Sequence, residues 1–527
     1  MNICLIEPSK FVSITNFVST VCMPPIGLSY IAAALRQAGH QVTLIDGPGS
    51  ALTNYFSFRN VYVRGLDSHE VVSEVPCDVQ VIGLGCMFSS NWIYVRELIK
   101  VIRKEFPSVF IILGGEHVTG FPEFSLKQAP FDVAVLGEGE ETVDELIRYV
   151  EQGKPLMNVK GIAFRDSSGQ VKINERRPRI RDIDSIPLPA WDLFKIESYI
   201  QHNQPHGSSQ GRFIPMIATR GCPFQCTFCT NPNMWTTRWI PRNYKKIVDE
   251  MQLYQEKYNI TDFQFEDLTA LVRSDWIIDF CDEIISRNMK ITFQMPAGTR
   301  SECINYEVAL KLKKAGCHEL SFAPESGDPR VLKAIKKRVN LNRMFKSARE
   351  TLKAGINVGC FFIIGFPEDS YASILRTYAA IIKCALIGFT NANLNSYSPQ
   401  PNTESFRNLQ ENGVISELSD DYLMSLFTFQ DFGARKKSFN PKFNDYELSF
   451  LVIIGEGLFY IFYFLRKPQR ILFLIRDLFS ETAENKSSKI LKSALKDCKN
   501  LFRLKLRNFF NFYGIIRNSK KTGTGSH

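Results

Sequence analysis

Short apolar segments that are typical of β-strands alternate with amphipathic helical segments twice along this chain of 527 residues. The first alternation covers residues 1–152 and the second covers residues 211–404. Such alternation favours parallel sheets, because parallel neighbours need a long crossover that a helix usually provides. We therefore predict two α/β domains, joined by a connector at residues 153–210 and followed by a helical C-terminal domain at residues 405–521.

The first alternation fits a doubly wound, flavodoxin-like parallel sheet. Its predicted strands are residues 2–7, 41–46, 79–85, 110–114 and 133–136. The second alternation contains six strand–helix units, which favours a partial (β/α)6 barrel of the TIM type. Its predicted strands are residues 214–219, 262–266, 290–294, 319–323, 357–364 and 391–396. Within the connector, residues 161–164 and 171–174 flank a Ser-Ser-Gly turn and predict a hairpin.

Three cysteines, Cys222, Cys226 and Cys229, form a Cys-x₃-Cys-x₂-Cys array just after the first strand of the second alternation. Three thiolates at this spacing can ligate three irons of a [4Fe–4S] cluster and leave the fourth iron open for chemistry. A structural zinc site is the alternative, but neither His206 nor His318 lies at a zinc-motif spacing from the array. A disulfide framework is disfavoured, because the thirteen cysteines are an odd number and most lie in apolar runs.

The array resembles the signature of the radical S-adenosylmethionine (SAM) family. In that family the amino and carboxylate groups of SAM chelate the open iron, and an electron from the cluster releases a 5′-deoxyadenosyl radical. The resemblance extends to a Glu-Ser-Gly segment after the fourth strand, but Phe361 replaces the first glycine of the segment that meets adenine. It implies that SAM contacts Phe228, Glu266, Asp267, Arg300, Glu325, Ser326, Ile364 and Gly365.

Glycine and small polar residues follow the strands of the first alternation, where the backbone of such a sheet can approach a ligand closely. Together these segments resemble the cobalamin-binding domain that precedes many radical SAM domains, and the resemblance covers nearly all of residues 1–150. It implies that cobalamin contacts Pro25, Gly27, Met87, Phe88, Ser89, Gly114, Gly115, Glu116, His117, Gly137, Glu138 and Gly139.

The first strand lacks the Asp-x-His-x-x-Gly segment of cobalamin domains that supply a lower axial ligand. That position reads Glu-Pro-Ser-Lys-Phe at residues 7–11, and residues 46–49 contain no histidine either. We therefore predict that cobalamin binds without a histidine beneath the cobalt. His117 is the one histidine at a strand end; the prediction is that it lines the cobalamin pocket and does not ligate cobalt.

The C-terminal domain contains an apolar run at residues 449–465 with Glu456 at its centre. This run is at the short limit for a membrane span, and the carboxylate is unfavourable there, so we expect a buried helix or one that faces an apolar substrate. Residues 466–521 carry fifteen Lys and Arg against four Asp and Glu, so the net charge of +10 belongs to the tail. Residues 489–517 predict either a bundle helix with a solvated face or a basic amphipathic helix on an anionic membrane. The apolar face disfavours nucleic acid as a partner.

Over residues 1–400 the chain resembles cobalamin-dependent radical SAM enzymes, nearest the branch with anaerobic magnesium-protoporphyrin monomethyl ester cyclase and hopanoid methylases. The resemblance implies a [4Fe–4S] cluster, SAM and methylcobalamin, and an electron donor of the flavodoxin or ferredoxin type. It implies methyl transfer to an unactivated carbon of an apolar small molecule, such as a lipid or tetrapyrrole. An oxidative cyclase or rearrangement enzyme is the alternative, and a cobalamin-sensing binding protein with an inactive barrel is one of another class. Reduced cysteines and a start without a signal-peptide pattern favour the cytoplasm, with membrane contact through the tail.

Overall fold

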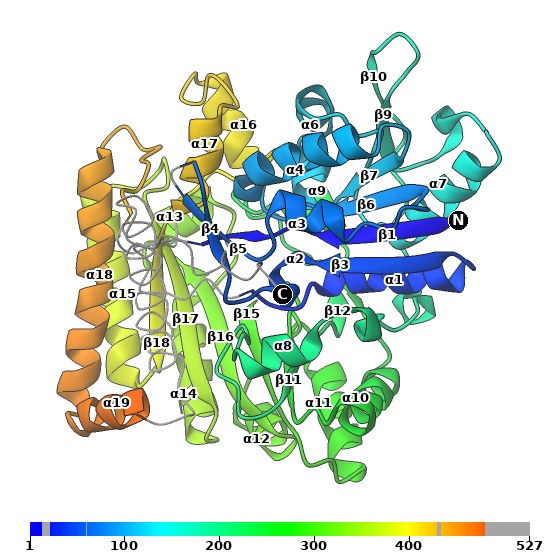
Figure 1. Cartoon of the computed structure of the whole chain (residues 1–527). Coiled ribbons are helices and arrows are strands. Elements are labelled where there is room, and N and C mark those ends of the chain that lie inside the picture. Colours follow the sequence, from blue (N-terminus) through cyan, green and yellow to red (C-terminus); the bar gives the residue numbers. More distant parts are fainter. Residues whose placement is uncertain (13–21, 60, 429–433, 480–527) are drawn as a thin grey trace, which may run out of the picture.

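The computed structural model describes residues 1–12, 22–59, 61–428 and 434–479. This part of the chain contains two α/β units and a helical C-terminal region, as the fold class predicted from the sequence requires. In Figure 1 the first sheet, in blue and cyan, lies above the second, in green and yellow. The predicted basic helix at residues 489–517 lies outside the described residues.

The first unit is built on a seven-stranded sheet in the order β10-β9-β8-β7-β6-β1-β3. Its parallel strands are β1 (Asn2–Glu7), β3 (Gln41–Asp46), β6 (Val81–Gly85), β7 (Phe110–Gly114) and β8 (Val133–Val135). Successive side chains of a strand point to opposite faces. Leu5 therefore packs in the core below α1 (Ile26–Gln37) and α7 (Glu140–Glu151), whereas Ile6 packs in the core below α4 (Trp92–Glu105).

The hairpin predicted in the connector forms, with strands β9 (Ile162–Arg165) and β10 (Val171–Ile173). Strand β9 pairs antiparallel with β8, so the hairpin extends the first sheet beyond residue 152. A second, small sheet that the sequence pattern does not reveal contains β2 (Lys10–Val12), β4 (Tyr55–Phe58) and β5 (Val61–Arg64). It lies beside the loop that follows β1.

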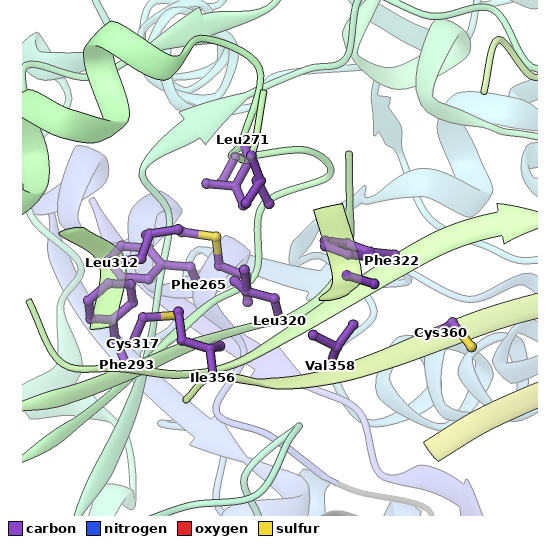
Figure 2. Packing of buried hydrophobic residues seen from close by; sticks show 14 of the residues in the cluster. Phe265, Leu271, Phe293, Leu312, Cys317, Leu320, Phe322, Ile356, Val358 and Cys360 are labelled. Atoms are coloured by element: carbon purple, nitrogen blue, oxygen red, sulfur yellow. The ribbon is translucent and has the colours of Figure 1, made fainter. Parts of the chain in front are cut away.

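The second unit is an open barrel of six parallel strands in the order β11-β14-β15-β16-β17-β18. The strands are β11 (Phe213–Met216), β14 (Asp262–Phe265), β15 (Thr292–Thr299), β16 (Cys317–Glu325), β17 (Asn357–Ile364) and β18 (Asn391–Ser396). The helices are α10 (Tyr244–Tyr258), α11 (Ser274–Ser286), α12 (Tyr306–Lys314), α13 (Pro329–Ala334), α14 (Leu341–Lys353) and α15 (Tyr371–Ile387). Figure 2 shows part of the core, in which Phe265, Leu320 and Val358 from three of the strands are buried.

The described C-terminal region contains α16 (Glu404–Glu411), α17 (Asp420–Ser425), α18 (Asp445–Arg466) and α19 (Gln469–Phe479). Helix α18 begins at a capping box, in which Asn444 accepts from the Glu447 backbone and Glu447 accepts from the Asn444 backbone. It packs against α15 and covers the edge strand β18. Glu456 contributes to this cover, because its Oε1 accepts a hydrogen bond from the Leu394 N–H at 3.4 Å. Burial raises the pKa of Glu456 to about 7.

Helix α18 is buried along one face only. Leu448, Val452 and Phe459 are buried, whereas Phe450 is 63 % and Leu465 is 68 % exposed. In length and composition it is the one helix among the described residues that could cross a membrane. The expectation of a buried helix is therefore met on the side that faces the barrel, and the other side remains an apolar surface.

Candidate active site

The three cysteines of the array lie together on the loop between β12 (Thr219–Arg220) and α9 (Asn231–Trp235), at the carboxyl end of the barrel. All three thiols are free and partly buried, and the charges of Cys222 and Cys226 raise the pKa of Cys229. The backbone N–H of Asn231 donates to Cys229 Sγ at 3.5 Å. Burial raises the pKa of the Cys229 thiol to about 12, so assembly of a cluster has to displace its proton.

The surroundings of this loop fit a bound [4Fe–4S] cluster. Lys337 and Arg300 are close enough to Cys222 and Cys226 to favour their thiolate forms, and cations of this kind balance a cluster of negative charge. Within the described residues, no three His, Cys, Asp or Glu side chains converge on a site for a single metal ion. A cubane does not require such convergence, because its ligating thiolates are separated by the cluster itself.

Glu266 follows β14 at the mouth of the barrel and has one carboxylate oxygen to offer a ligand. Its Oε2 lies 2.7 Å from Nδ1 of His206, a residue of the connector. Its Oε1 is buried and has no hydrogen-bond partner in the described part of the chain. A buried carboxylate oxygen without a partner is costly, so it fits the ammonium group of the methionine part of SAM.

Glu325 and Ser326 form the end of β16. Glu325 has a left-handed backbone with φ of 67°, and its Oε1 accepts from Lys337 Nζ at 2.9 Å. The Ser326 hydroxyl accepts from the Asp328 N–H at 3.1 Å and lies 3.3 Å from the Thr377 hydroxyl. The polar contacts of Ser326 therefore stabilise the turn that follows β16. The Glu325–Lys337 pair lies beside the cysteine loop.

The remaining predicted SAM residues lie around the same end of the barrel. Ile364 is buried at the end of β17, and Gly365 has φ of +90° with Leu448 of α18 against the position of a Cβ. Phe228 packs its ring against Phe366 at 5.4 Å between centroids. Arg300 stacks on Phe224 of the cysteine loop, 4.0 Å from the ring centroid.

Asp267 has a different role from the one predicted. It is buried and accepts hydrogen bonds from the Ala218 N–H and from both the N–H and the hydroxyl of Thr219. Burial raises its pKa to about 6 against the effect of these donors. Because its oxygens are occupied by the strand that leads into the cysteine loop, Asp267 positions that loop and does not offer a free carboxylate to SAM.

The strand ends of the first unit present apolar side chains and open backbone. Met87 and Phe88, after β6, are 58 % and 59 % exposed, which is unusual for a neighbouring pair of large apolar residues. A Cβ added at Gly27 or at Gly114 would point into open space. Pro25 precedes α1 as its N-cap residue. This surface fits the flat face of a large cofactor such as cobalamin.

The same strand ends contact the cysteine loop of the second unit. Helix α5 (Glu116–Gly120) packs against α9. Burial raises the pKa of the Glu116 carboxyl overall, although Thr230, next to Cys229, lies close enough to lower that pKa in part. The left-handed Gly137 lies near the carbonyl of Met234 in α9. Gly115, also left-handed, has no room for a Cβ against the Cys86 backbone, and Gly139 has none against Ile31. The two predicted cofactor surfaces therefore adjoin each other.

His117 packs inside the first unit and does not line an open surface. Its ring is fully buried, stacks on Trp92 at 4.8 Å between centroids, and accepts from or donates to Ser89 Oγ through Nδ1 at 2.9 Å. Burial lowers its pKa to about 3, so the ring is neutral. The prediction that His117 and Ser89 contact cobalamin is therefore not supported, because the two side chains are hydrogen-bonded to each other inside the first unit.

We expect bound cobalt to show no nitrogen ligand from the protein. Cobinamide, which lacks the nucleotide base of cobalamin, makes the test clean, since any nitrogen hyperfine coupling must then come from a side chain. The EPR spectrum of protein-bound cob(II)inamide should show no such coupling, and His117→Phe should give the same spectrum. A coupling that disappears in His117→Phe would contradict this prediction.

A buried ion-pair network joins the first unit to the residue that precedes the cysteine loop. Arg220 donates to Glu138 Oε1 at 3.1 Å and to Glu140 Oε1 at 2.5 Å. The other Glu138 oxygen accepts from Arg179 Nε at 2.5 Å, and both guanidinium groups lie on the ring of Trp235. Glu138, predicted as a cobalamin contact, is therefore committed to this network and is 8 % exposed.

Sequence reasoning missed three residues of this region: His206, Lys337 and Arg220. His206 lies in a polar connector far from Glu266 in the sequence, so only the folded chain brings them together. Lys337 lies in a conspicuously basic stretch, which is a signal that could have been followed. Arg220 stands directly before the Gly-Cys pair of the array, and its position there is a local signal.

Comparison with known families assigns the same two units. A model of the B12 binding domain matches residues 12–147, and a model of the radical SAM superfamily matches residues 216–381. An uncharacterised methyltransferase of Pyrococcus horikoshii is 29 % identical over 379 residues, which cover 72 % of this chain and 77 % of the relative.

Two further relatives agree with this assignment. The anaerobic magnesium-protoporphyrin IX monomethyl ester cyclase of Cereibacter sphaeroides is 28 % identical over 404 residues, covering 75 % of this chain and 62 % of the cyclase. The solved structure of the cobalamin-dependent SAM radical enzyme OxsB, with aqua-cobalamin and SAM bound, superposes with a TM-score of 0.65 at 17 % identity. It covers 98 % of this chain and 82 % of OxsB. The chain therefore belongs to the cobalamin-dependent radical SAM enzymes, whose cofactors are a [4Fe–4S] cluster, SAM and cobalamin.

Proposed function

We propose that this enzyme transfers a methyl group, by way of cobalamin, to an unactivated carbon of an apolar substrate. The observation that carries this proposal is the contact between the two cofactor surfaces, through Glu116 and Thr230 and through Arg220 and Glu138. A radical formed at the cluster can reach a methyl donor only when the two sites share one space. A methyltransferase among its relatives supports the same reaction.

The residues of this chain bind and orient, because the cofactors supply the difficult chemistry. When bound, the cluster and SAM supply a carbon-centred radical and cobalamin supplies the methyl group. The three cysteines hold the cluster, and the free oxygen of Glu266 fits the ammonium group of SAM. Lys337 holds Glu325 at the strand end next to the cluster. Met87 and Phe88 cover one cofactor face and exclude water there.

Oxidative cyclisation is the second candidate, and the cyclase relative favours it. Stoichiometry separates the two reactions, because methyl transfer consumes SAM both as radical source and as methyl source. We expect 5′-deoxyadenosine and S-adenosylhomocysteine in equal amounts, with the labelled methyl of SAM retained in the product. Lipid extracts and tetrapyrrole esters are the substrates to be tried first. Formation of 5′-deoxyadenosine without S-adenosylhomocysteine, in a substrate-dependent reaction, would instead establish the cyclase.

We also infer that the enzyme works in the cytoplasm at the surface of a membrane, where an apolar substrate would be found. The exposed side of α18 supports this inference. Phe450, Ile453, Ile461 and Leu465 are between 41 % and 68 % exposed and lie on one face of the helix. Basic residues follow in α19 and in the tail, and each one near an anionic leaflet contributes about 1 kcal/mol to binding.

Flotation with vesicles tests this inference. Full-length protein should float with anionic vesicles at low salt, and less with neutral vesicles or at high salt, because salt screens the tail charges. The triple variant Phe450→Ser, Ile461→Ser, Leu465→Ser should lose most of the binding. The matched control, Met157→Ser with Ile173→Ser, changes exposed apolar residues of the first unit and should bind normally. Equally poor flotation of full-length protein and of a truncation before Lys486 would contradict a role for the tail.

A further inference from the structure

Residues 329–353 carry a strong local excess of positive charge. This stretch contains nine Lys and Arg and one Glu, and it spans α13, the turn after it and α14. This excess of positive charge is separate from that of the tail at residues 466–521. Most of these cations are on the surface, since the side chains of Arg330 and Lys346 are 74 % and 77 % exposed.

In the described part of the chain, four of the nine cations pair with an acidic side chain, namely Arg330, Lys336, Lys337 and Lys346. Asp328 is shared between Arg330 and Arg376 of α15, and Lys336 pairs with Glu404 at 2.6 Å. Lys333 and Arg338 are exposed, and neither forms an ion pair with an acidic side chain in the ranges that the structure describes. The surface formed by α13, α14 and their connecting turn, the basic surface, therefore keeps an uncompensated positive field.

The basic surface is hollowed by a groove of about 670 Å³. Leu332, Val339 and Phe345 line its floor, whereas Lys333, Arg338 and Lys383 stand at its rim. An apolar centre with a charged rim is the arrangement of a protein–protein interface, in which the centre provides binding energy and the rim provides orientation.

The turn between α13 and α14 contacts the cysteine loop, so it connects the basic surface with the predicted cluster site. The carbonyl oxygen of Lys336 lies 3.9 Å from Cys226 Sγ, and the Thr227 N–H donates to the Ile335 carbonyl at 3.0 Å. Lys337, the next residue, points inward to Glu325. Lys336, an exposed cation of this surface, therefore contacts a predicted ligand of the cluster through its own carbonyl oxygen, which makes the turn a short way for an electron to enter.

We propose that the basic surface is the docking site of an acidic one-electron donor protein of the flavodoxin or ferredoxin type. The proposal rests on the proposed function, because each cleavage of SAM consumes one electron. The donor is oxidised by one electron and the cluster is reduced by one. That electron breaks the bond between sulfur and C5′ of SAM, which yields methionine and the 5′-deoxyadenosyl radical. Charge complementarity selects the donor, since the surface is cationic and the groove floor is apolar.

Charge reversal tests the proposal in the reconstituted, full-length enzyme. The rate of 5′-deoxyadenosine formation is measured with reduced flavodoxin and, separately, with dithionite. Complementary surface charge raises association rates by about 10- to 1000-fold, so reversal should reduce the flavodoxin-dependent rate at low salt at least tenfold. The dithionite-dependent rate should not change, because a small reductant needs no docking surface. The test variant is Lys333→Glu, Arg338→Glu, Lys346→Glu.

The matched control reverses three exposed lysines on α10 and α12, and both rates should stay as in the wild type. The control variant is Lys245→Glu, Lys313→Glu, Lys314→Glu. An unchanged flavodoxin-dependent rate in the test variant would overturn the proposal, and so would an equal loss with dithionite, which indicates damage to the cluster. Inorganic phosphate could instead inhibit 5′-deoxyadenosine formation equally with both reductants, and fail to inhibit the test variant. That result would overturn the proposal and make the groove a site for small anions. If wild-type enzyme with dithionite forms no 5′-deoxyadenosine, the proposed function itself fails.

Discussion

Replacing Cys226 by Ala should abolish both the [4Fe–4S] cluster and the formation of 5′-deoxyadenosine. Two remaining thiolates cannot hold a cubane with one open iron. Iron, acid-labile sulfide and the absorption of the cluster are measured after anaerobic reconstitution, and 5′-deoxyadenosine is measured by chromatography.

The control for this variant is Cys77→Ala, which removes an exposed thiol outside the array. It should retain the full iron content and normal SAM cleavage. Cleavage of SAM by Cys226→Ala at more than a trace would show that the array is not the cluster site. Normal iron content without cleavage would show that Cys226 is not one of its three ligands.

Replacing Arg220 by Met should destabilise the contact between the two units more than any surface change. The side chain is 5 % exposed, and its removal leaves the Glu140 carboxylate buried without its partner and Glu138 with Arg179 alone. Breaking a buried pair in this way costs about 3–5 kcal/mol. The exposed pair Arg148–Asp144 is the matched control, because Arg148→Met should cost less than about 1 kcal/mol.

The pH dependence of stability tests whether the unpaired carboxylate of Glu140 causes the destabilisation in Arg220→Met. Burial would raise the pKa of Glu140, but Arg220 outweighs it and the pKa lies below its usual value. In the wild type this pair therefore stabilises the fold above the ordinary pKa of Glu, and the contribution is lost as the pH falls. Without Arg220 burial dominates, the pKa of Glu140 rises, and stability should fall as the pH rises. Denaturant unfolding at several pH values measures both slopes.

The rescue variant Glu140→Gln, Arg220→Met removes the carboxylate that Arg220→Met leaves without a partner, while Glu138 keeps its pair with Arg179, and it should recover part of the lost stability. It should also remove the reversed slope. If it is as unstable as Arg220→Met alone, lost packing against Trp235 and not a buried charge explains the effect.

The parallel strands could be predicted from the sequence because both of their faces are buried. Residues 357–364 form a strand with the predicted limits, since a largely apolar run ends where the strand ends. Residues 391–396 also form the predicted strand, although four of these six residues are polar. The cysteine loop was predictable for a local reason, because its three ligands lie within eight residues. The small sheet of β2, β4 and β5 was not predictable, because short strands from separate segments pair only after folding.

Side-chain direction limited the prediction of the cofactor sites. Asp267 and Glu266 are neighbours at one strand end, yet one turns to the backbone of residues 218–219 and the other keeps a free oxygen. His117 lies after a strand like a pocket residue, but it fills a space beside Trp92. Glu138 pairs with arginines that are 41 and 82 residues away in the sequence. Such choices depend on tertiary neighbours, which a single sequence does not display.

Helix α18 connects the proposed membrane-facing surface with the predicted SAM site. Leu448 on its buried face lies against Gly365, at the strand end where SAM is predicted to bind, while Phe450 on its opposite face is exposed. A membrane that displaced α18 would therefore displace Gly365, and SAM bound at Gly365 would bias the position of the helix in return. Such coupling is reciprocal: the factor by which vesicles change the affinity for SAM equals the factor by which SAM changes the affinity for vesicles.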